Sequence, residues 1–183
     1  MRKVVGMFAA AAMLAPIGLS AAPSGAAVAA VTAGTTCKSM SGTGMFSPTL
    51  PKLTSSSKVR SVLNAIGSVA SCSGSVNSGS VKFVSTRSAP ENCKTLGLPP
   101  TLPIKGTETI AWSNGMSSTI AFKLAEIPGN PVTTQALTGT VTGGLFKGLS
   151  QKSKLMYTPA GGGCTSTGLS RITYSSTASM TIK

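Results

Sequence analysis

Residues 106–127 alternate between apolar and polar side chains with a period of two, which is typical of β-strands that bury one face. The alternation is interrupted once, at Ser113-Asn114-Gly115, which indicates a hairpin turn. A two-residue turn would put Trp112 and Ile120 on opposite faces, whereas a three-residue loop pairs Trp112 with Met116 and collects the apolar residues on one face. Because burial of one face sets the register, we predict the three-residue loop, with its glycine in the left-handed conformation.

The rest of the chain repeats this pattern between clusters of Gly, Pro, Ser and Asn. We expect further strands near 38–46, 60–70, 80–87, 136–146, 152–158 and 171–182. The stretch Val59–Val69 also places apolar residues at helical spacing, so a helix is the alternative there. Eight or nine short alternating strands predict an all-β fold with antiparallel pairing. We expect an immunoglobulin-like sandwich of two sheets, with a closed β-barrel as the alternative.

The N-terminus has the three parts of a secretory signal peptide. A basic head is followed by an almost continuously apolar run over Val4–Leu19 and then by small residues. The small-x-small site Ala27-Val28-Ala29 predicts a signal peptide over 1–29, a short flexible mature N-terminus over 30–36 and a single β domain over 37–183. An uncleaved anchor is disfavoured because the run is shorter than the roughly 20 residues of a spanning helix. We therefore expect a secreted protein without a transmembrane segment in its mature chain.

Four cysteines in an exported chain predict two disulfides. The sequence allows three pairings, of which we favour Cys37 with Cys72 and Cys93 with Cys164. The first bond would close the open end of a hairpin, and the second would join two loops. A zinc site made of the four cysteines is disfavoured because no C-x-x-C pair is present.

Basic residues dominate the charge of the chain. Without the predicted signal peptide, 14 basic residues stand against three glutamates, which gives a net charge of +11. Alternate residues of a strand share a face, so Lys58 with Arg60, and Lys152 with Lys154, could each present two charges together. With Lys147, these residues are candidate contacts for polyanions. The alternatives are a generally basic, solvated surface and, for Lys152 and Lys154, protection of an edge strand.

The side chains that most enzymes need are absent. The chain contains no His and no Asp, which excludes Ser-His-Asp and Cys-His catalysis and histidine metal sites. Glu108 and Glu126 would lie roughly 20 Å apart along the predicted hairpin, too far for glycosidase chemistry, so we expect them to be solvated. The serine acyl-transfer signature S-x-x-K occurs at Ser55–Lys58, but in a Ser-rich loop without companion motifs. We predict no catalytic residues, no cofactor and no metal.

Seven aromatic residues follow the predicted signal peptide, and most of them fit the apolar parity of their strands. Phe146 is the exception, because it is out of phase with Leu145 and lies in a Gly-rich run beside Lys147. It is either an exposed tip that contacts a ligand or a residue turned inward by a bulge. Nucleic-acid binding is not expected, because basic and aromatic residues are not interleaved.

Several short motifs together resemble a group of small, basic, secreted actinobacterial proteins that have four cysteines and no characterised function. The motifs are the run Gly139–Gly148 (GTVTGGLFKG), Tyr157-Thr158-Pro159 before Cys164, Phe46-Ser47-Pro48, Asn92-Cys93-Lys94 and Ile172-x-Tyr174. This resemblance covers nearly all of the mature chain. It implies export and a disulfide-bonded, β-rich fold, and it implies no activity.

Two functions are compatible with these observations. The first is a non-enzymatic extracellular protein whose positive charge holds it near the cell envelope, on anionic polymers or lipid headgroups. The alternative is a soluble, secreted β-sandwich that binds a specific small molecule or protein, as a carrier or an inhibitor. The first predicts binding that weakens as salt is added, and the second predicts a partner that is insensitive to salt.

Overall fold

The structure is a computed structural model that describes residues 33–86, 89–93, 104–127, 134–161 and 163–183. The predicted signal peptide over 1–29 lies outside these residues, as does most of the segment 30–36. Eight β-strands make up the described chain. They are β1 (Thr35–Leu50), β2 (Val62–Cys72), β3 (Gly79–Thr86), β4 (Ile104–Trp112), β5 (Ser117–Glu126), β6 (Thr134–Gly144), β7 (Ser150–Gly161) and β8 (Leu169–Ile182).

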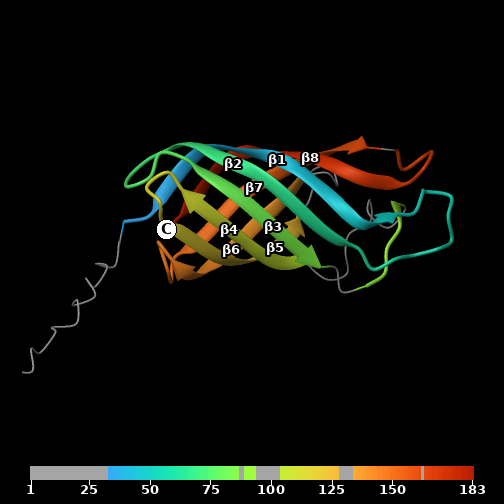
Figure 1. Ribbon diagram of the computed structural model, residues 1–183, viewed down its shortest axis with the longest axis horizontal. Helices are drawn as coiled ribbons and strands as arrows, with labels where there is room; N and C mark the ends of the chain where they lie inside the picture. The colour runs from blue at the N-terminus through green and yellow to red at the C-terminus, as the bar shows by residue number, and fades with distance from the viewer. Residues whose placement is uncertain (1–32, 87–88, 94–103, 128–133, 162) are drawn as a thin grey trace, which may run out of the picture.

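The strands form one sheet that closes on itself, in the order β1 to β8 (Figure 1). Each strand pairs antiparallel with its sequence neighbours, and β1 also pairs with β8, from Thr35 opposite Ile182 to Leu50 opposite Leu169. The all-β class and the antiparallel pairing are confirmed, and the stretch Val59–Val69 is a strand from Val62 onward, with Val59 in an isolated bridge to Glu91. The closed barrel is the alternative that fits, because this pairing leaves one sheet rather than the two of a sandwich.

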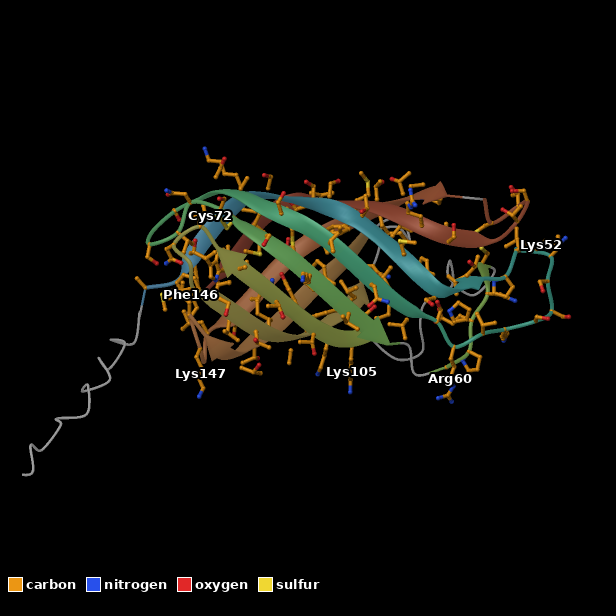
Figure 2. All side chains as sticks on the ribbon, in the orientation of Figure 1. Lys52, Arg60, Cys72, Lys105, Phe146 and Lys147 are labelled. Carbon is orange, nitrogen blue, oxygen red and sulfur yellow. A yellow bond between two sulfur atoms is a disulfide. The ribbon has the colours of Figure 1, made fainter. Side chains whose placement is uncertain are left out.

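The barrel has two different ends. At one, called the turn end, short turns follow β2, β4 and β6, and β1 begins beside the last residues of β8. At the other, called the loop end, the longer connections follow β1, β3, β5 and β7. Figure 2 shows Phe146 and Lys147 at the turn end and Lys52 and Arg60 at the loop end. The two ends therefore differ in the length of the connections between strands.

The turn between β4 and β5 has the predicted geometry. The backbone N–H of Trp112 donates to the carbonyl of Met116 at 2.8 Å, and Gly115 has a φ of 81°. This is the three-residue loop with a left-handed glycine, and it directs Trp112 and Ile120 into the barrel, where both are buried. Burial of the apolar face therefore determined the register, as expected.

Aromatic side chains fill the turn end. The indole N–H of Trp112 donates to the hydroxyl of Ser118 at 2.8 Å, and Ser118 donates to the carbonyl of Leu145 at 2.5 Å. The ring of Phe146 meets that of Trp112 edge-on at 5.6 Å. Phe146 is 2% exposed and has a φ of 65°, so the turn directs it inward. The proposed ligand-contacting tip at Phe146 is thus wrong, and the inward alternative holds.

Disulfides join chain segments at both ends, in the pairing that we favoured. Cys37 is bonded to Cys72 across the β1–β2 pair at the turn end, and Cys93 is bonded to Cys164 between two loops at the loop end. They close loops with sequence separations of 35 and 71 residues. On the chain-entropy estimate, each bond stabilises the fold by about 4 kcal/mol.

A smaller core at the loop end fastens the connection after β1. The backbones of Val59 and Glu91 exchange two hydrogen bonds, of 2.8 and 2.7 Å, and Cys93 donates to the carbonyl of Pro51 at 2.9 Å. The amide of Asn92 donates to the carbonyl of Ser55 at 2.8 Å. The S-x-x-K match at Ser55–Lys58 therefore lies in an irregular loop, not on the buried helix that its chemistry requires. The apolar members of this core are Phe46, Leu50, Cys93, Leu169 and Ile172.

Candidate functional site

A cavity lies inside the barrel towards the loop end. Its volume is about 60 Å³, which is room for about four to six water molecules. Leu63, Leu124 and Tyr157 are the lining residues that are only partly buried, so they mark the rim. Every strand contributes to the wall, which consists of Phe46, Leu63, Ala65, Phe83, Ser85, Ile104, Phe122, Leu124, Gln135, Leu155, Tyr157, Ile172 and Tyr174.

The wall is rich in aromatic rings. Phe83 meets Phe122 edge-on at 5.4 Å and Tyr174 edge-on at 5.6 Å. Together with Phe46 and Tyr157, these give the cavity five of the seven aromatic residues that follow residue 30. These five residues lie on five different strands. Each occupies a position whose side chain points into the barrel, because successive side chains of a strand point to opposite faces. Edge-to-face pairs of this kind stabilise the packing by about 0.5–1.5 kcal/mol beyond the burial of the rings.

Two glycines make room for the phenol of Tyr174. Gly42 and Gly67 face each other across β1 and β2, and an added Cβ would lie 2.5 and 2.3 Å, respectively, from the Tyr174 hydroxyl oxygen. Larger side chains at either position would collide with this ring. The position of the Tyr174 hydroxyl is thus determined by the absence of side chains on two neighbouring strands.

Polar groups lie beneath the cavity, and we call Glu108, Gln151, Ser153 and Tyr174 the polar floor. The amide nitrogen of Gln151 donates to Oε2 of Glu108 at 2.7 Å. Glu108 and Gln151 have no exposed surface, and Ser153 and Tyr174 are each 7% exposed. Tyr174 also lines the cavity, which connects the floor to the space above it.

Burial controls the ionisation of the polar floor. Removal from water raises the pKa of Glu108 to about 8, although the hydrogen bond from Gln151 acts in the opposite direction. Burial also raises the pKa of the Tyr174 hydroxyl, and the charge of Glu108 raises it further. A carboxyl group of this kind is mostly protonated near neutral pH when nothing cationic lies beside it.

The expectation that Glu108 is solvated is wrong. The residue was treated only as one of a glutamate pair, but the alternation that places Ile110 and Trp112 inward also places Glu108 inward. Its position opposite Ile120 is as expected. The parity of β7 gives the same signal for Gln151 and Ser153, which share a face with Leu155. The polar floor could therefore have been found by following strand parity through the polar residues.

The proposed polyanion contacts do not form one surface. Lys152 and Lys154 are exposed on the outer face of β7, and Lys147 lies in the adjoining turn. Lys58 and Arg60 are exposed in the connection after β1, at the opposite, loop end, where Figure 2 labels Arg60. An edge-protecting role for the β7 lysines is excluded, because β7 pairs on both sides.

A basic row on the outside of the barrel was missed from the sequence. Lys105 of β4 lies directly opposite Lys123 of β5, then Thr138 of β6, then Lys152 of β7. All three lysines are exposed. Like charges placed directly opposite destabilise a sheet, by roughly 0.2–1 kcal/mol. The cross-strand register, which the sequence does not show for distant strands, creates this row.

Among the described residues, no three His, Cys, Asp or Glu side chains come together in a way that could hold a metal ion. The same part of the chain contains no helix of the length and apolar character needed to cross a membrane. No protein-family model, curated protein or solved structure matches the chain. The function must therefore be argued from the barrel itself. Its two disulfides are compatible with an extracellular location.

Proposed function

We propose that this protein is a secreted, non-enzymatic binding protein whose barrel holds a small, largely apolar molecule. The observation that carries the proposal is the aromatic cavity at the loop end, to which all eight strands contribute. Eight-stranded barrels are just wide enough to be filled by side chains or to hold one small ligand. Here Trp112 and Phe146 fill the turn end, and the space is left at the other end.

The composition of the wall supports an apolar ligand. The polar side chains of the wall are Ser85, Gln135, Tyr157 and Tyr174. The amide of Gln135 donates to the Tyr157 hydroxyl at 3.4 Å. Binding sites for small molecules commonly combine an apolar wall with a few polar groups. A cavity of this size fits about six non-hydrogen atoms, on the basis of one for each water-sized volume.

The direct test is titration with 1-pentanol, which has six non-hydrogen atoms, followed by NMR of the aromatic side chains. The Phe and Tyr ring signals of the cavity should shift, while the indole signal of Trp112 at the turn end should not. Ala65→Leu, which places a larger side chain in the cavity wall, should abolish binding. Ala121→Leu, on the exposed outer face of β5, is the matched control and should bind normally. Absence of ring shifts in the unmodified protein at millimolar pentanol would refute the proposal.

A second candidate function is association with anionic polymers or lipid headgroups of the cell envelope through the positive exterior. The basic row of Lys105, Lys123 and Lys152 favours it, because an anionic partner would relieve the repulsion between facing lysines. Both glutamates whose side chains are described, Glu91 and Glu108, are buried. They therefore contribute little exposed negative charge to the described outer surface.

Co-sedimentation with isolated bacterial envelopes across a salt series tests this second function. Binding should weaken as salt rises, because screening shortens the range of charge attraction. Lys123→Glu combined with Lys152→Glu should reduce binding more than Lys58→Glu combined with Arg60→Glu, which alters the same number of charges at the loop end. Binding that is equal for both variants would argue against a role for the row.

A further inference from the structure

The barrel interior contains hydrogen-bond acceptors that lack donors. Among the described residues, four oxygen atoms inside the barrel have no hydrogen-bonding partner: Oε1 of Glu108, Oε1 of Gln151, Oγ of Ser153 and the hydroxyl oxygen of Tyr174. Each belongs to a side chain that is at least 93% buried. A buried polar atom without a partner costs about 1–3 kcal/mol, so four in one interior require an explanation.

Tyr174 lines the cavity, and the other three residues lie on β4 and β7 nearer the turn end than the cavity-lining residues of those strands. Glu108 and Gln151 are joined by their hydrogen bond, and Ser153 is the next inward-facing residue of β7 after Gln151. Glu108 lies directly opposite Phe83 of the cavity wall, whose ring contacts Tyr174. Burial raises the pKa of the Tyr174 hydroxyl, and the charge of Glu108 raises it further. The four oxygens therefore face a common interior beneath the aromatic wall.

When Glu108 is ionised, all four atoms can accept a hydrogen bond, and the hydroxyls of Ser153 and Tyr174 can also donate one. A ligand group with several donors would satisfy them together. A primary ammonium group carries three N–H donors and no acceptor. Glu108 would supply its counter-charge, and a ring face that Phe83, Phe122 or Tyr174 presents to the ammonium group would attract it further. An alcohol offers one donor and no charge. A carboxylate ligand offers acceptors only and would be repelled by an ionised Glu108.

We propose that the ligand of the cavity is a small primary amine, with its ammonium group on the polar floor and its apolar part against the aromatic wall. This inference rests on the proposed function, because it requires the cavity to hold a small molecule. It adds the charge and polarity of that molecule and its orientation. The cation pairs with the ionised form of Glu108, which is buried inside the barrel.

The net charge of the exterior gives this proposal a distinctive salt dependence. A small cation approaches a chain with 14 basic residues and three acidic ones after residue 3. Added salt screens this repulsion over a Debye length of about 8–10 Å, whereas the contact with Glu108 is buried and screened much less. Amine binding should therefore become tighter as salt is added, opposite to the behaviour of a polyanion at the outer surface.

The experiment compares n-pentylamine, 1-pentanol and pentanoate, which share a five-carbon chain, by NMR titration of the full oxidised mature protein at neutral pH. Pentylamine should bind at least tenfold more tightly than pentanol, and pentanoate should bind weakest. Glu108→Gln keeps the shape of the side chain and should remove the preference for the amine. Tyr174→Phe, which keeps the ring and removes one acceptor, should reduce it by a smaller factor.

The outcomes separate the two proposals. If pentanol binds as tightly as pentylamine, or if Glu108→Gln retains the preference, the amine assignment is refuted and the apolar carrier stands. In that case, water molecules are the donors to the polar floor. If none of the three compounds shifts the ring signals of the cavity, both proposals fail. Weaker pentylamine binding at higher salt would also contradict the amine assignment, because it would indicate a site on the outer surface.

Discussion

Replacing Glu108 with Gln should stabilise the empty protein, and the gain should depend on pH. In the unfolded chain this carboxyl group titrates near its ordinary pKa of 4.5, whereas burial raises the pKa in the folded barrel to about 8. Between these values the folded protein holds a proton that the unfolded chain releases. The contribution of Glu108 to stability is therefore fully present below pH 4.5 and is lost as pH rises through 8.

The magnitude follows from the size of the pKa difference. Each pKa unit corresponds to 1.36 kcal/mol, so a rise from 4.5 to about 8 corresponds to about 5 kcal/mol. The Gln side chain has no titration and can still accept the hydrogen bond from Gln151. Glu108→Gln should thus match the unmodified protein at pH 4.5 and exceed its free energy of unfolding by about 5 kcal/mol above pH 8.

Urea denaturation with the disulfides intact, measured from pH 4.5 to pH 9, provides the assay. The quantity to compare is the difference between the variant and the unmodified protein, because all other titrating groups cancel in it. Ala121→Ser, on the exposed outer face of β5, is the control, and its difference should stay constant over the same range. A Glu108→Gln difference that is constant with pH, or that shrinks as pH rises, would refute the assignment of a buried, mostly neutral carboxyl group.

Three further substitutions test the fold. Gly67→Ala places a Cβ 2.2 Å from the carbonyl oxygen of Ser41 and 2.3 Å from the Tyr174 hydroxyl, so it should cost about 3 kcal/mol in urea denaturation, and a neutral result would contradict the close packing around that ring. Gly115→Ala meets no atom within 4 Å but has a φ of 81°, so it should cost about 1–2 kcal/mol, and Gly115→Asn should cost less if backbone conformation is the cause. Replacing Cys93 and Cys164 together by Ala should lower stability by about 4 kcal/mol, and calorimetry showing an unchanged Tm would argue against the chain-entropy account.

The period of two in the sequence is sufficient to predict the strands and one register. Trp112 and Ile120 can share a buried face only if the turn between them has three residues, and the structure has that turn. The same pattern does not predict that the sheet closes into a barrel. A strand has the same alternation of apolar and polar residues in an open sheet and in a closed one. Closure depends on the pairing of Thr35 with Ile182, which are far apart in sequence.

The candidate site was harder to predict because it depends on what the side chains leave unfilled. The sequence places aromatic residues inward but does not show that Gly42 and Gly67 lie side by side beneath Tyr174. Polar residues on an apolar face are visible in the sequence, and Glu108 could have been placed inside by parity alone. Parity does not place Phe146 inside the barrel, because a single residue with a left-handed backbone reverses the parity that its neighbours suggest.

The pairing of β1 with β8 has a practical consequence for handling the protein. Thr35 and Ile182 lie opposite each other at the turn end, and Lys183 exchanges two backbone hydrogen bonds with Ser150 there. The C-terminus therefore leaves the barrel on the side farthest from the cavity rim (Figure 1). A peptide tag attached after Lys183 would anchor the molecule to a sensor surface with its mouth facing the solution. The site could then be screened for ligands without the support obstructing their entry.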